Sequence, residues 1–183
     1  MKQKIQLRKK YFNLRKKNYY DIDKSFFLPL FKLIRLKFKK KHTKIALYYP
    51  TNFELNVLKL LEFNNIMSHN TLLPIAEKNN IMNFFSWEKN QVLFVNKFGI
   101  LEPIKTEPKV PDIMLIPLLA FDKKKHRLGY GKGFYDRYLN KYLKKFKNIL
   151  SVGVAFSFQR HHKLPISQND VKLDFIITEK GIH

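Results

Sequence analysis

Residues 112–137 read DIMLIPLLAFDKKKHRLGYGKGFYDR, in which an apolar run of strand length leads through a loop and a glycine cluster towards a helix. The run Asp112–Ile116 predicts a buried strand, and the residues from about Gly133 to Lys145 predict the helix. Apolar strands that alternate with helices are typical of layered α/β proteins. This stretch therefore predicts an α/β fold.

Apolar and amphipathic patterns on both sides extend this prediction. Three prolines in residues 99–111 predict a connection across the surface. The expected architecture is a single-domain layered α/β fold over residues 1–183, with a mainly parallel central sheet flanked by helices. Helices are expected at residues 2–19, 26–41 and 53–64, the last capped by Asn52, and further strands at 45–49, 71–76, 82–87, 92–94, 149–156 and 173–178.

The composition indicates a folded, cysteine-free protein. Apolar residues make up 45% of the 183 residues, which excludes an intrinsically disordered chain, and a chain of this length buries a full core as one domain. The absence of Cys excludes disulfides, thiolate metal sites and thiol catalysis. Residues 1–20 lack the apolar core of a signal peptide, and no later stretch is long enough to span a bilayer. A cytoplasmic protein without a membrane partner is expected.

The formal net charge of +22 raises nucleic acid as a partner, because clustered Lys side chains neutralise phosphates. Lys, Asn, Ile, Phe and Tyr are all abundant together, which favours compositional drift at tolerant surface positions instead. The sequence lacks the signatures of RNA-recognition, KH, zinc-finger and helix-turn-helix modules. No specific nucleic-acid partner is expected, although a polyanionic partner stays open as an alternative.

Three of the six glycines lie at positions 129, 131 and 133, between the predicted strand and helix. Alternate glycines let a backbone approach a ligand closely, and the amides at a helix N-terminus attract an anion. Arg127 and Lys132 add positive charge to this loop. The pattern therefore predicts a phosphate site, with a purely structural glycine turn as the alternative.

Asp136 follows the loop by one helical turn, where its carboxylate is able to hold Mg²⁺ that bridges phosphate oxygens. The loop is neither a Walker A motif nor the dinucleotide-binding fingerprint, because both need a different glycine spacing. The superfamilies that carry those two motifs are therefore poor fits.

Residues 117–137 closely resemble the signature of the 5-formyltetrahydrofolate cyclo-ligase family. Four other segments match family elements in the same order along the chain. They are Lys4-Ile-Gln-Leu-Arg8, residues 49–54, Gly99-Ile-Leu-Glu-Pro103 and the closing segment 152–179.

This resemblance implies an ATP- and Mg²⁺-dependent conversion of 5-formyltetrahydrofolate to 5,10-methenyltetrahydrofolate, with release of ADP and phosphate. It implies a catalytic role for Arg127, Lys132 and Tyr135, and magnesium ligation by Asp136 and Asp170. The residues implied to bind ATP are Lys4, Ile5, Gln6, Leu7, Arg8, Arg127, Leu128, Gly129, Tyr130, Gly131, Lys132, Gly133, Phe134 and Tyr135. Those implied to bind the folate are Tyr49, Glu54, Phe98, Tyr130 and Lys132.

The residue types suit these roles. Lys4 and Arg8 are four apart and therefore share one helix face, from which both reach a single polyphosphate. The carboxylate of Glu54 is able to accept two parallel hydrogen bonds from a pterin ring. The alternative is that Glu54, near the start of a predicted helix, interacts favourably with the helix dipole. We expect a monomer that takes a folate with or without a polyglutamate tail, which the Lys surplus would attract.

Three residues depart from the family pattern. Lys132 stands where many relatives have Gly, Phe134 where they have Tyr, and Phe98 where some carry Trp. Each change keeps size or adds charge, so it bears on folate affinity more than on the activity. His161 and His162 match no metal motif and are expected to be solvated loop residues. The competing functions are a nucleic-acid-binding module that kept only the fold, and another small-molecule kinase or ligase with the same ATP loop.

Overall fold

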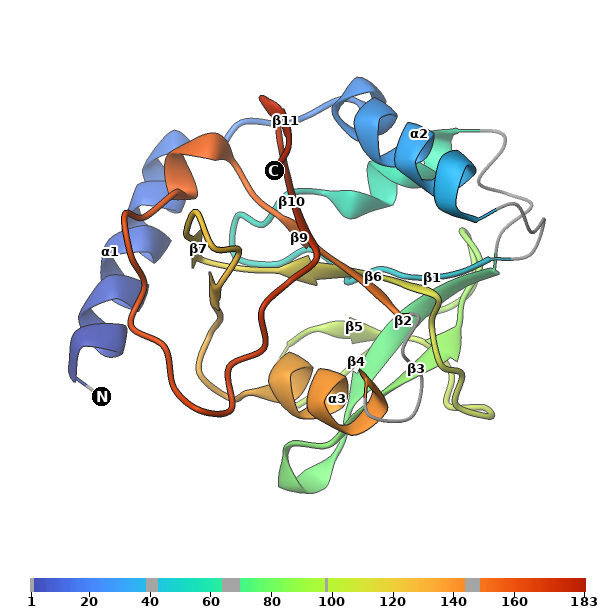
Figure 1. The fold of residues 1–183 in the computed structure, drawn as a ribbon. Helices are drawn as coiled ribbons and strands as arrows, with labels where there is room; N and C mark the ends of the chain where they lie inside the picture. The colour runs from blue at the N-terminus through green and yellow to red at the C-terminus, as the bar shows by residue number, and fades with distance from the viewer. Residues whose placement is uncertain (1, 39–42, 64–69, 98, 144–148) are drawn as a thin grey trace.

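The computed structural model describes residues 2–38, 43–63, 70–97, 99–143 and 149–183 (Figure 1). Its α-helices are α1 (Lys2–Asn18), α2 (Leu28–Lys37) and α3 (Phe134–Leu143). Short 3₁₀ helices lie at Lys24–Phe27, Val57–Glu62, Lys78–Asn80 and Ser157–Gln159. No helix among the described residues combines the length and the apolar surface that a membrane span requires.

The central sheet is mainly parallel, as the sequence predicts. Its strand order is β11-β10-β9-β6-β1-β2-β3, and the five inner strands are parallel to one another, whereas β3 and β11 are antiparallel edges. The seven strands are β1 (Lys44–Ala46), β2 (Asn70–Ala76), β3 (Met82–Ser86), β6 (Ile113–Pro117), β9 (Leu150–Val154), β10 (Phe175–Thr178) and β11 (Gly181–Ile182). Two hairpins lie outside this sheet, β4 (Phe94–Val95) with β5 (Leu101–Glu102) and β7 (Ala120–Phe121) with β8 (Arg127–Leu128).

Both faces of the sheet are covered, which is why its inner strands read as continuous apolar runs. One face packs against α2 and the 3₁₀ helix Val57–Glu62, with Leu30 and Ile34 fully enclosed. The other face packs against α3 through Tyr138 and Leu139. Figure 1 shows α2 and α3 on opposite sides of the sheet. These layers confirm the predicted α/β architecture.

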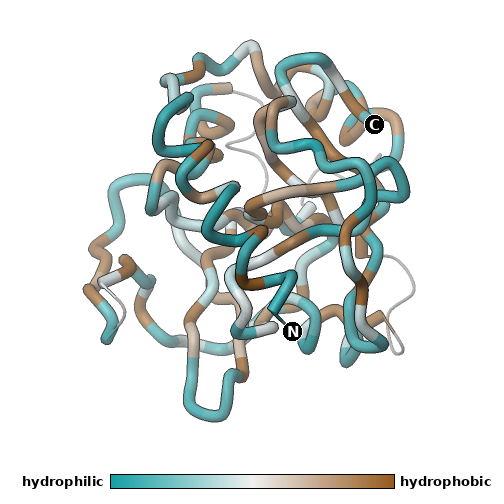
Figure 2. The backbone as a smooth tube through the Cα atoms, turned by 90° about the vertical axis from the view of Figure 1, so that its left-hand side faces the viewer, coloured by the Kyte–Doolittle hydropathy of each residue, from teal (hydrophilic) through white to brown (hydrophobic). Residues whose placement is uncertain are grey.

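Helix α1 packs on neither face but lies at the end of the sheet where the parallel strands finish (Figure 1). It rests through Tyr11 on a small apolar cluster made with Leu119, Ala120, Leu128 and Leu164. Figure 2 looks onto this edge and shows α1, mostly hydrophilic, towards the viewer. Ligands of open α/β sheets bind at the carboxyl ends of the strands. Helix α1 therefore brings its side chains to the edge where a ligand is expected.

The α-helix predicted for residues 53–64 is wrong. Asn52 and Phe53 have φ angles of 51° and 63°, which break the chain away from a right-handed helix. The helix begins only after Asn56, whose side chain caps it, and it is a 3₁₀ helix over Val57–Glu62. Glu54 therefore lies in a turn between strand and helix, so the helix dipole does not explain its presence.

Other boundaries differ less. Residues 99–111 contain β5, and the loop between β6 and α3 contains the β7–β8 hairpin, since two-residue strands leave little pattern in a sequence. Pro74 is accommodated within β2, beyond the three residues that pair with β1. Helix α2 ends at Lys37, before the expected residue 41, and residues 39–42 and 144–145 lie outside the described part of the chain.

Gly153 in the middle of β9 allows close packing of the sheet. A Cβ atom there would lie 2.6 Å from Ile176 Cδ1 and 2.8 Å from both Leu118 Cδ2 and Leu173 Cδ1. Because three neighbours would have to shift together, we expect Gly153→Ala to lower the free energy of unfolding by about 1–3 kcal/mol in urea denaturation. Gly129→Ala is the control, since a Cβ there meets nothing within 4 Å and should cost under about 0.5 kcal/mol. Equal stability of both variants would contradict this packing argument.

Candidate active site

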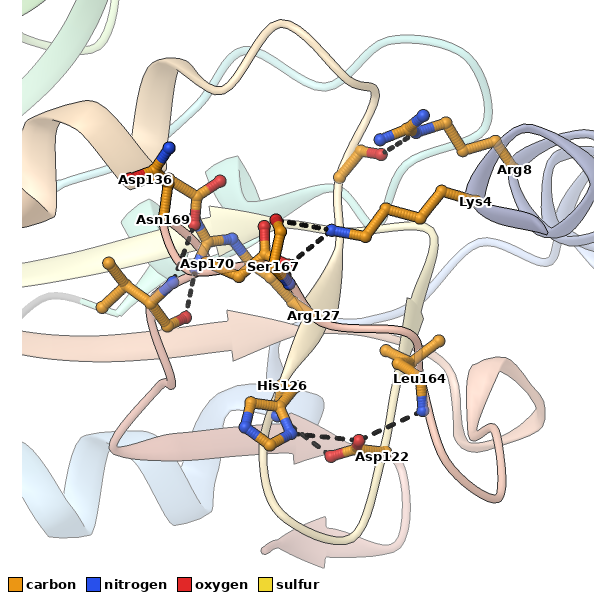
Figure 3. A network of polar contacts seen from close by, with 12 residues as sticks. Lys4, Arg8, Asp122, His126, Arg127, Asp136, Leu164, Ser167, Asn169 and Asp170 are labelled. Atoms are coloured by element: carbon orange, nitrogen blue, oxygen red, sulfur yellow. Dashed lines mark hydrogen bonds and ion pairs between the residues drawn. The ribbon is translucent and has the colours of Figure 1, made fainter. Parts of the chain in front are cut away.

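The β7–β8 hairpin precedes the loop of residues 129–133, which we call the glycine loop. The buried carboxylate of Asp122 holds this hairpin. It accepts hydrogen bonds from the backbone N–H groups of Lys124 (2.9 Å), His126 (3.0 Å) and Leu164 (3.3 Å), and it contacts the His126 ring at 3.1 Å (Figure 3). Burial opposes the ionisation of Asp122, but these bonds outweigh it and hold its pKa below the ordinary value. These bonds fix the geometry of the hairpin. They therefore also fix the position in β8 from which the Arg127 side chain extends.

The glycine loop lies directly against α1. Gly131 has a φ of +106°, and a Cβ atom at this residue would lie 3.1 Å from Cζ of Arg8. The Nε of Arg8 donates to the carbonyl oxygen of Gly129 at 2.8 Å. Gly131 is thus required twice, for its backbone angle and for the close approach of Arg8. The loop ends at Gly133, and α3 begins at the next residue, Phe134.

Buried Arg127 forms an ion pair with the partly exposed carboxylate of Asp136 (Figure 3). Arg127 Nη2 lies 2.7 Å from Asp136 Oδ1, and the Arg127 side chain is only 3% exposed. Arg127 Nη1 donates to the Val171 carbonyl at 3.0 Å, and the Val171 N–H donates to Asp136 Oδ1 at 3.1 Å. Burial lowers the pKa of Arg127, and the neighbouring Asp136 opposes this change. The pair fixes the segment that carries Asp170.

Lys4 reaches the same segment from α1. Its Nζ lies 2.5 Å from Asp170 Oδ2 and 3.1 Å from Ser167 Oγ (Figure 3). The Ser167 N–H donates to the same carboxylate oxygen at 2.7 Å. Burial opposes the ionisation of Asp170, yet the bonds from Lys4 and Ser167 hold its pKa below the ordinary value. Two residues 166 positions apart in sequence are thus paired.

Glu54 is buried and hydrogen-bonded, with 7% of its surface exposed. The Tyr130 hydroxyl donates to Oε1 at 2.5 Å, and the Thr51 N–H donates to Oε2 at 2.9 Å, with the Thr51 hydroxyl at 3.3 Å. Burial raises the pKa of Glu54, although the bonds from Tyr130 and Thr51 and the charge of Arg15 oppose the rise. A carboxyl group predicted to bind the folate is therefore in contact with the glycine loop.

Arg15 belongs to this arrangement, although the sequence analysis did not place it in the site. It is 1% exposed, and its Nη2 donates to the Tyr130 hydroxyl oxygen at 2.5 Å and to the Asn52 carbonyl at 2.8 Å. A signal was present: Lys4, Arg8 and Arg15 recur at helical spacings of four and seven, so one face of α1 carries all three. Because α1 contains many other Lys residues, this spacing did not distinguish Arg15 from them.

The remaining residues of the predicted site divide by burial. Lys132 is exposed at the loop, and the Leu128 side chain is in the core, so Leu128 is able to meet a ligand only through its backbone. Ile5 is 58% exposed and Gln6 is exposed, both on the outside of α1. Partly buried are Leu7, Tyr49, Phe134 and Tyr135, and burial raises the pKa of Tyr135. Phe98 lies outside the described residues.

His161 is not the solvated residue that the sequence analysis expected. Its Nδ1 lies 3.0 Å from the Tyr11 hydroxyl, and the two rings meet edge to face with centroids 5.7 Å apart. The Tyr11 hydroxyl also donates to the Arg160 carbonyl at 3.2 Å. His161 therefore helps to hold α1 at the edge of the sheet, whereas His162 is exposed as expected.

Asp136 and Asp170 are suited to a hard cation. Every hydrogen bond that the described residues make to these two carboxylates falls on one oxygen of each, Oδ1 of Asp136 and Oδ2 of Asp170. The described residues hold no group of three or more His, Cys, Asp or Glu side chains that could by itself bind a metal ion. A magnesium ion here would take its remaining ligands from phosphate and water, as Mg²⁺ commonly does.

Comparisons with known proteins agree on one family. Residues 1–179 match the 5-formyltetrahydrofolate cyclo-ligase family. The chain is 33% identical to a probable 5-formyltetrahydrofolate cyclo-ligase of Schizosaccharomyces pombe over 62% of this chain and 63% of that one. It is 32% identical to the 5-formyltetrahydrofolate cyclo-ligase of Haemophilus influenzae over 74% of this chain and 75% of that one. The solved structure of Aquifex aeolicus 5,10-methenyltetrahydrofolate synthetase is similar with a TM-score of 0.74 and 31% identity, covering 98% of this chain and 91% of that one.

Proposed function

Because the chain belongs to the 5-formyltetrahydrofolate cyclo-ligase family, we propose that it converts 5-formyltetrahydrofolate to 5,10-methenyltetrahydrofolate with ATP and Mg²⁺, releasing ADP and phosphate. The γ-phosphoryl group passes from ATP to the formyl oxygen and ADP leaves. N10 attacks the activated carbon and gives up its proton, and phosphate departs with the formyl oxygen and takes up that proton as the ring closes. The observation that carries the proposal is the 2.5 Å hydrogen bond from Tyr130 of the glycine loop to Glu54. This bond joins one residue of the loop proposed for the nucleotide to the carboxylate proposed for the folate, which supports a shared site for both substrates.

The phosphates are proposed to lie on the glycine loop and the N-terminus of α3, whose free backbone N–H groups and dipole favour an anion. Lys4, Arg8 and Lys132 surround this position with positive charge from α1 and from the loop itself. Phosphoryl transfer depends mainly on positioning and on stabilisation of the charge in the transition state. A loop that is held by Arg8 and that follows a hairpin held by Asp122 supports that task.

Nucleotide binding is proposed to exchange the partner of Lys4 and to keep the pair between Arg127 and Asp136. Lys4 now contacts Asp170, and Arg127 contacts Asp136, each through one carboxylate oxygen. Phosphate would draw Lys4 towards itself, and the two carboxylates would then hold Mg²⁺, which when bound neutralises charge on the phosphate oxygens. The pairs keep four charged groups satisfied before the nucleotide arrives, which lowers the cost of their burial.

The pterin is proposed to bind at Glu54. A carboxylate offers about four acceptor positions, and Tyr130 and the two Thr51 groups already use three of them. The Thr51 hydroxyl, at 3.3 Å the longest of these contacts, is the one that a pair of ring N–H donors would displace. Tyr49 is proposed to line the same pocket by packing, and a role for Phe98 in folate binding stays a prediction.

The direct test mixes the purified protein with 5-formyltetrahydrofolate, Mg²⁺ and ATP and follows the near-ultraviolet absorbance of the methenyl product. We expect a rise that requires ATP and that falls at least about 100-fold in Lys132→Ala and in Asp136→Ala. Lys123→Ala, at an exposed lysine of the β7–β8 turn, is the control and should keep full activity. A folded protein that binds ATP and forms no product would overturn the folate assignment and favour another ligase.

A further inference from the structure

The buried guanidinium of Arg15 joins three parts of the site. From α1 it donates to the Leu118 carbonyl at 3.2 Å, to the Asn52 carbonyl at 2.8 Å and to the Tyr130 hydroxyl oxygen at 2.5 Å. These partners belong to the segment after β6, to the turn that carries Glu54 and to the glycine loop. A planar guanidinium presents several N–H groups in a fixed fork, which suits three acceptors that lie in different directions.

The Tyr130 hydroxyl is the centre of a directed chain of hydrogen bonds. Because it accepts from Arg15 Nη2, its own proton points to Glu54 Oε1. The charged and titratable groups that face Glu54 are Arg15 of α1, Tyr130 of the loop, Tyr48 after β1 and Tyr135 of α3. Arg15 is the cation among these four, so it favours the ionised form of Glu54.

We propose that Arg15 is a positioning residue, which holds Tyr130 against Glu54 and so sets the glycine loop and the folate carboxylate in one fixed arrangement. This inference rests on the proposed function, since it assigns Glu54 to the folate. Arg15 is 1% exposed, so we assign it no direct contact with substrate. It acts through Tyr130, whose hydroxyl is the shared atom of the two contacts.

The cost of burying Arg15 supports a role beyond packing. Its Nε atom is buried and has no hydrogen-bond partner among the described residues. An unsatisfied buried donor costs free energy, and apolar side chains of similar volume often stabilise a core better than a buried cation does. A need to keep the Glu54 carboxylate ionised and oriented would explain why a cation, Arg15, is buried at this position.

The test compares Arg15→Met, Arg15→Lys and Tyr130→Phe with the exposed control Lys16→Met of the same helix. We expect all three site variants to raise the KM for 5-formyltetrahydrofolate about 10- to 100-fold, with the KM for ATP changed much less. The double variant Arg15→Met with Tyr130→Phe should lose less than the product of the single losses, because both act through one hydroxyl. Lys16→Met should match the unmodified protein.

The pH dependence separates positioning from packing. The charge of Arg15 lowers the pKa of Glu54, so its removal raises that pKa, and in Arg15→Met the acid-side loss of kcat/KM for folate should begin at a higher pH. Arg15→Lys keeps a cation at this position, so we expect a smaller shift of the pH at which kcat/KM begins to fall.

A substrate-free measurement distinguishes failure of this inference from failure of the proposed function. NMR of the ¹³C-labelled Glu54 carboxyl group reads its protonation directly, and we expect its titration at higher pH in Arg15→Met than in the unmodified protein. An unchanged Glu54 titration together with a lowered melting temperature would overturn the inference and leave Arg15 a packing residue. An unmodified protein without cyclo-ligase activity would instead overturn the proposed function, whatever the titration shows.

Discussion

Glu54→Gln is expected to lower kcat/KM for 5-formyltetrahydrofolate about 100- to 1000-fold, with most of the loss in KM. Tyr130 and Thr51 both donate to this side chain, and the pterin ring would add further N–H donors. An amide offers one oxygen and turns its own N–H₂ group against one set of those donors. A buried donor facing a donor is left unpaired, which is the condition under which a site rejects a near-isosteric partner. Steady-state kinetics at saturating ATP measure the change.

The Glu54→Gln variant should lose activity without a matching loss of stability. The folded-state pKa of Glu54 is raised, mainly by burial, so above that pKa the ionised carboxylate reduces the stability of the fold, and this cost grows as the pH rises through it. A neutral Gln removes this cost but leaves one of the donors Tyr130 and Thr51 unpaired, so the two effects oppose each other and the melting temperature at pH 7 should stay close to that of the unmodified protein. The matched control is Glu107→Gln at an exposed surface carboxylate, which should change neither quantity. A fully active Glu54→Gln variant would show that the folate binds elsewhere.

The core of the fold was predictable because its strands are buried on both faces. In β6, Ile113, Met114, Leu115 and Ile116 are all buried, and every residue of β9 is buried as well. Such strands appear in a sequence as unbroken apolar runs, and no knowledge of their neighbours is needed to find them. The alternation of these runs with helical patterns was then sufficient to predict a mainly parallel sheet, which the strand order confirms.

The turn around Glu54 was not predictable in the same way. Asn adopts a left-handed backbone readily, but Phe rarely does, so Phe53 with a φ of 63° has no local signal. Two distant side chains hold this turn: Arg15 donates to the Asn52 carbonyl, and Tyr130 donates to the Glu54 carboxylate, which also accepts locally from the Thr51 N–H. The sequence showed a strand end followed by helical spacing, and it did not show the contacts of Arg15 and Tyr130 with this turn.

The site was partly visible in the sequence. The glycine loop, Arg127 and Asp136 lie within ten residues, so their shared location follows from local chain geometry. The contact of Lys4 with Asp170 joins residues 166 positions apart and the contact of Glu54 with Tyr130 joins residues 76 apart, and no spacing rule connects either pair. The first contact depends on α1 crossing the carboxyl end of the sheet, and the second depends on the turn after β1 meeting the loop after β8. The resemblance to a family indicated which residues belong to the site. Which of these residues contact one another is seen only in the folded structure.

Arg127→Lys is expected to lower the ATP-dependent rate about 100- to 1000-fold while the protein stays folded. Arg127 donates through Nη2 to Asp136 and through Nη1 to the Val171 carbonyl, two partners that a single ammonium group is unable to reach in the same geometry. The charge is kept, so the loss comes from the position of Asp136 and of the segment next to Asp170. Those are the carboxylates proposed for Mg²⁺. Kinetics at varied Mg²⁺ should show a raised magnesium requirement together with the lower kcat.

Comparison with two further variants distinguishes this role from simple support of the fold. Arg35→Lys changes an exposed arginine of α2 and should leave both rate and stability unchanged. Asp136→Asn removes the partner of Arg127, and if Arg127 acts through Asp136, the double variant Arg127→Lys with Asp136→Asn should be little worse than Asp136→Asn alone. Additive losses would mean that Arg127 acts on the phosphates independently of Asp136. A lowered melting temperature with an unchanged kcat would mean that the ion pair serves only the fold.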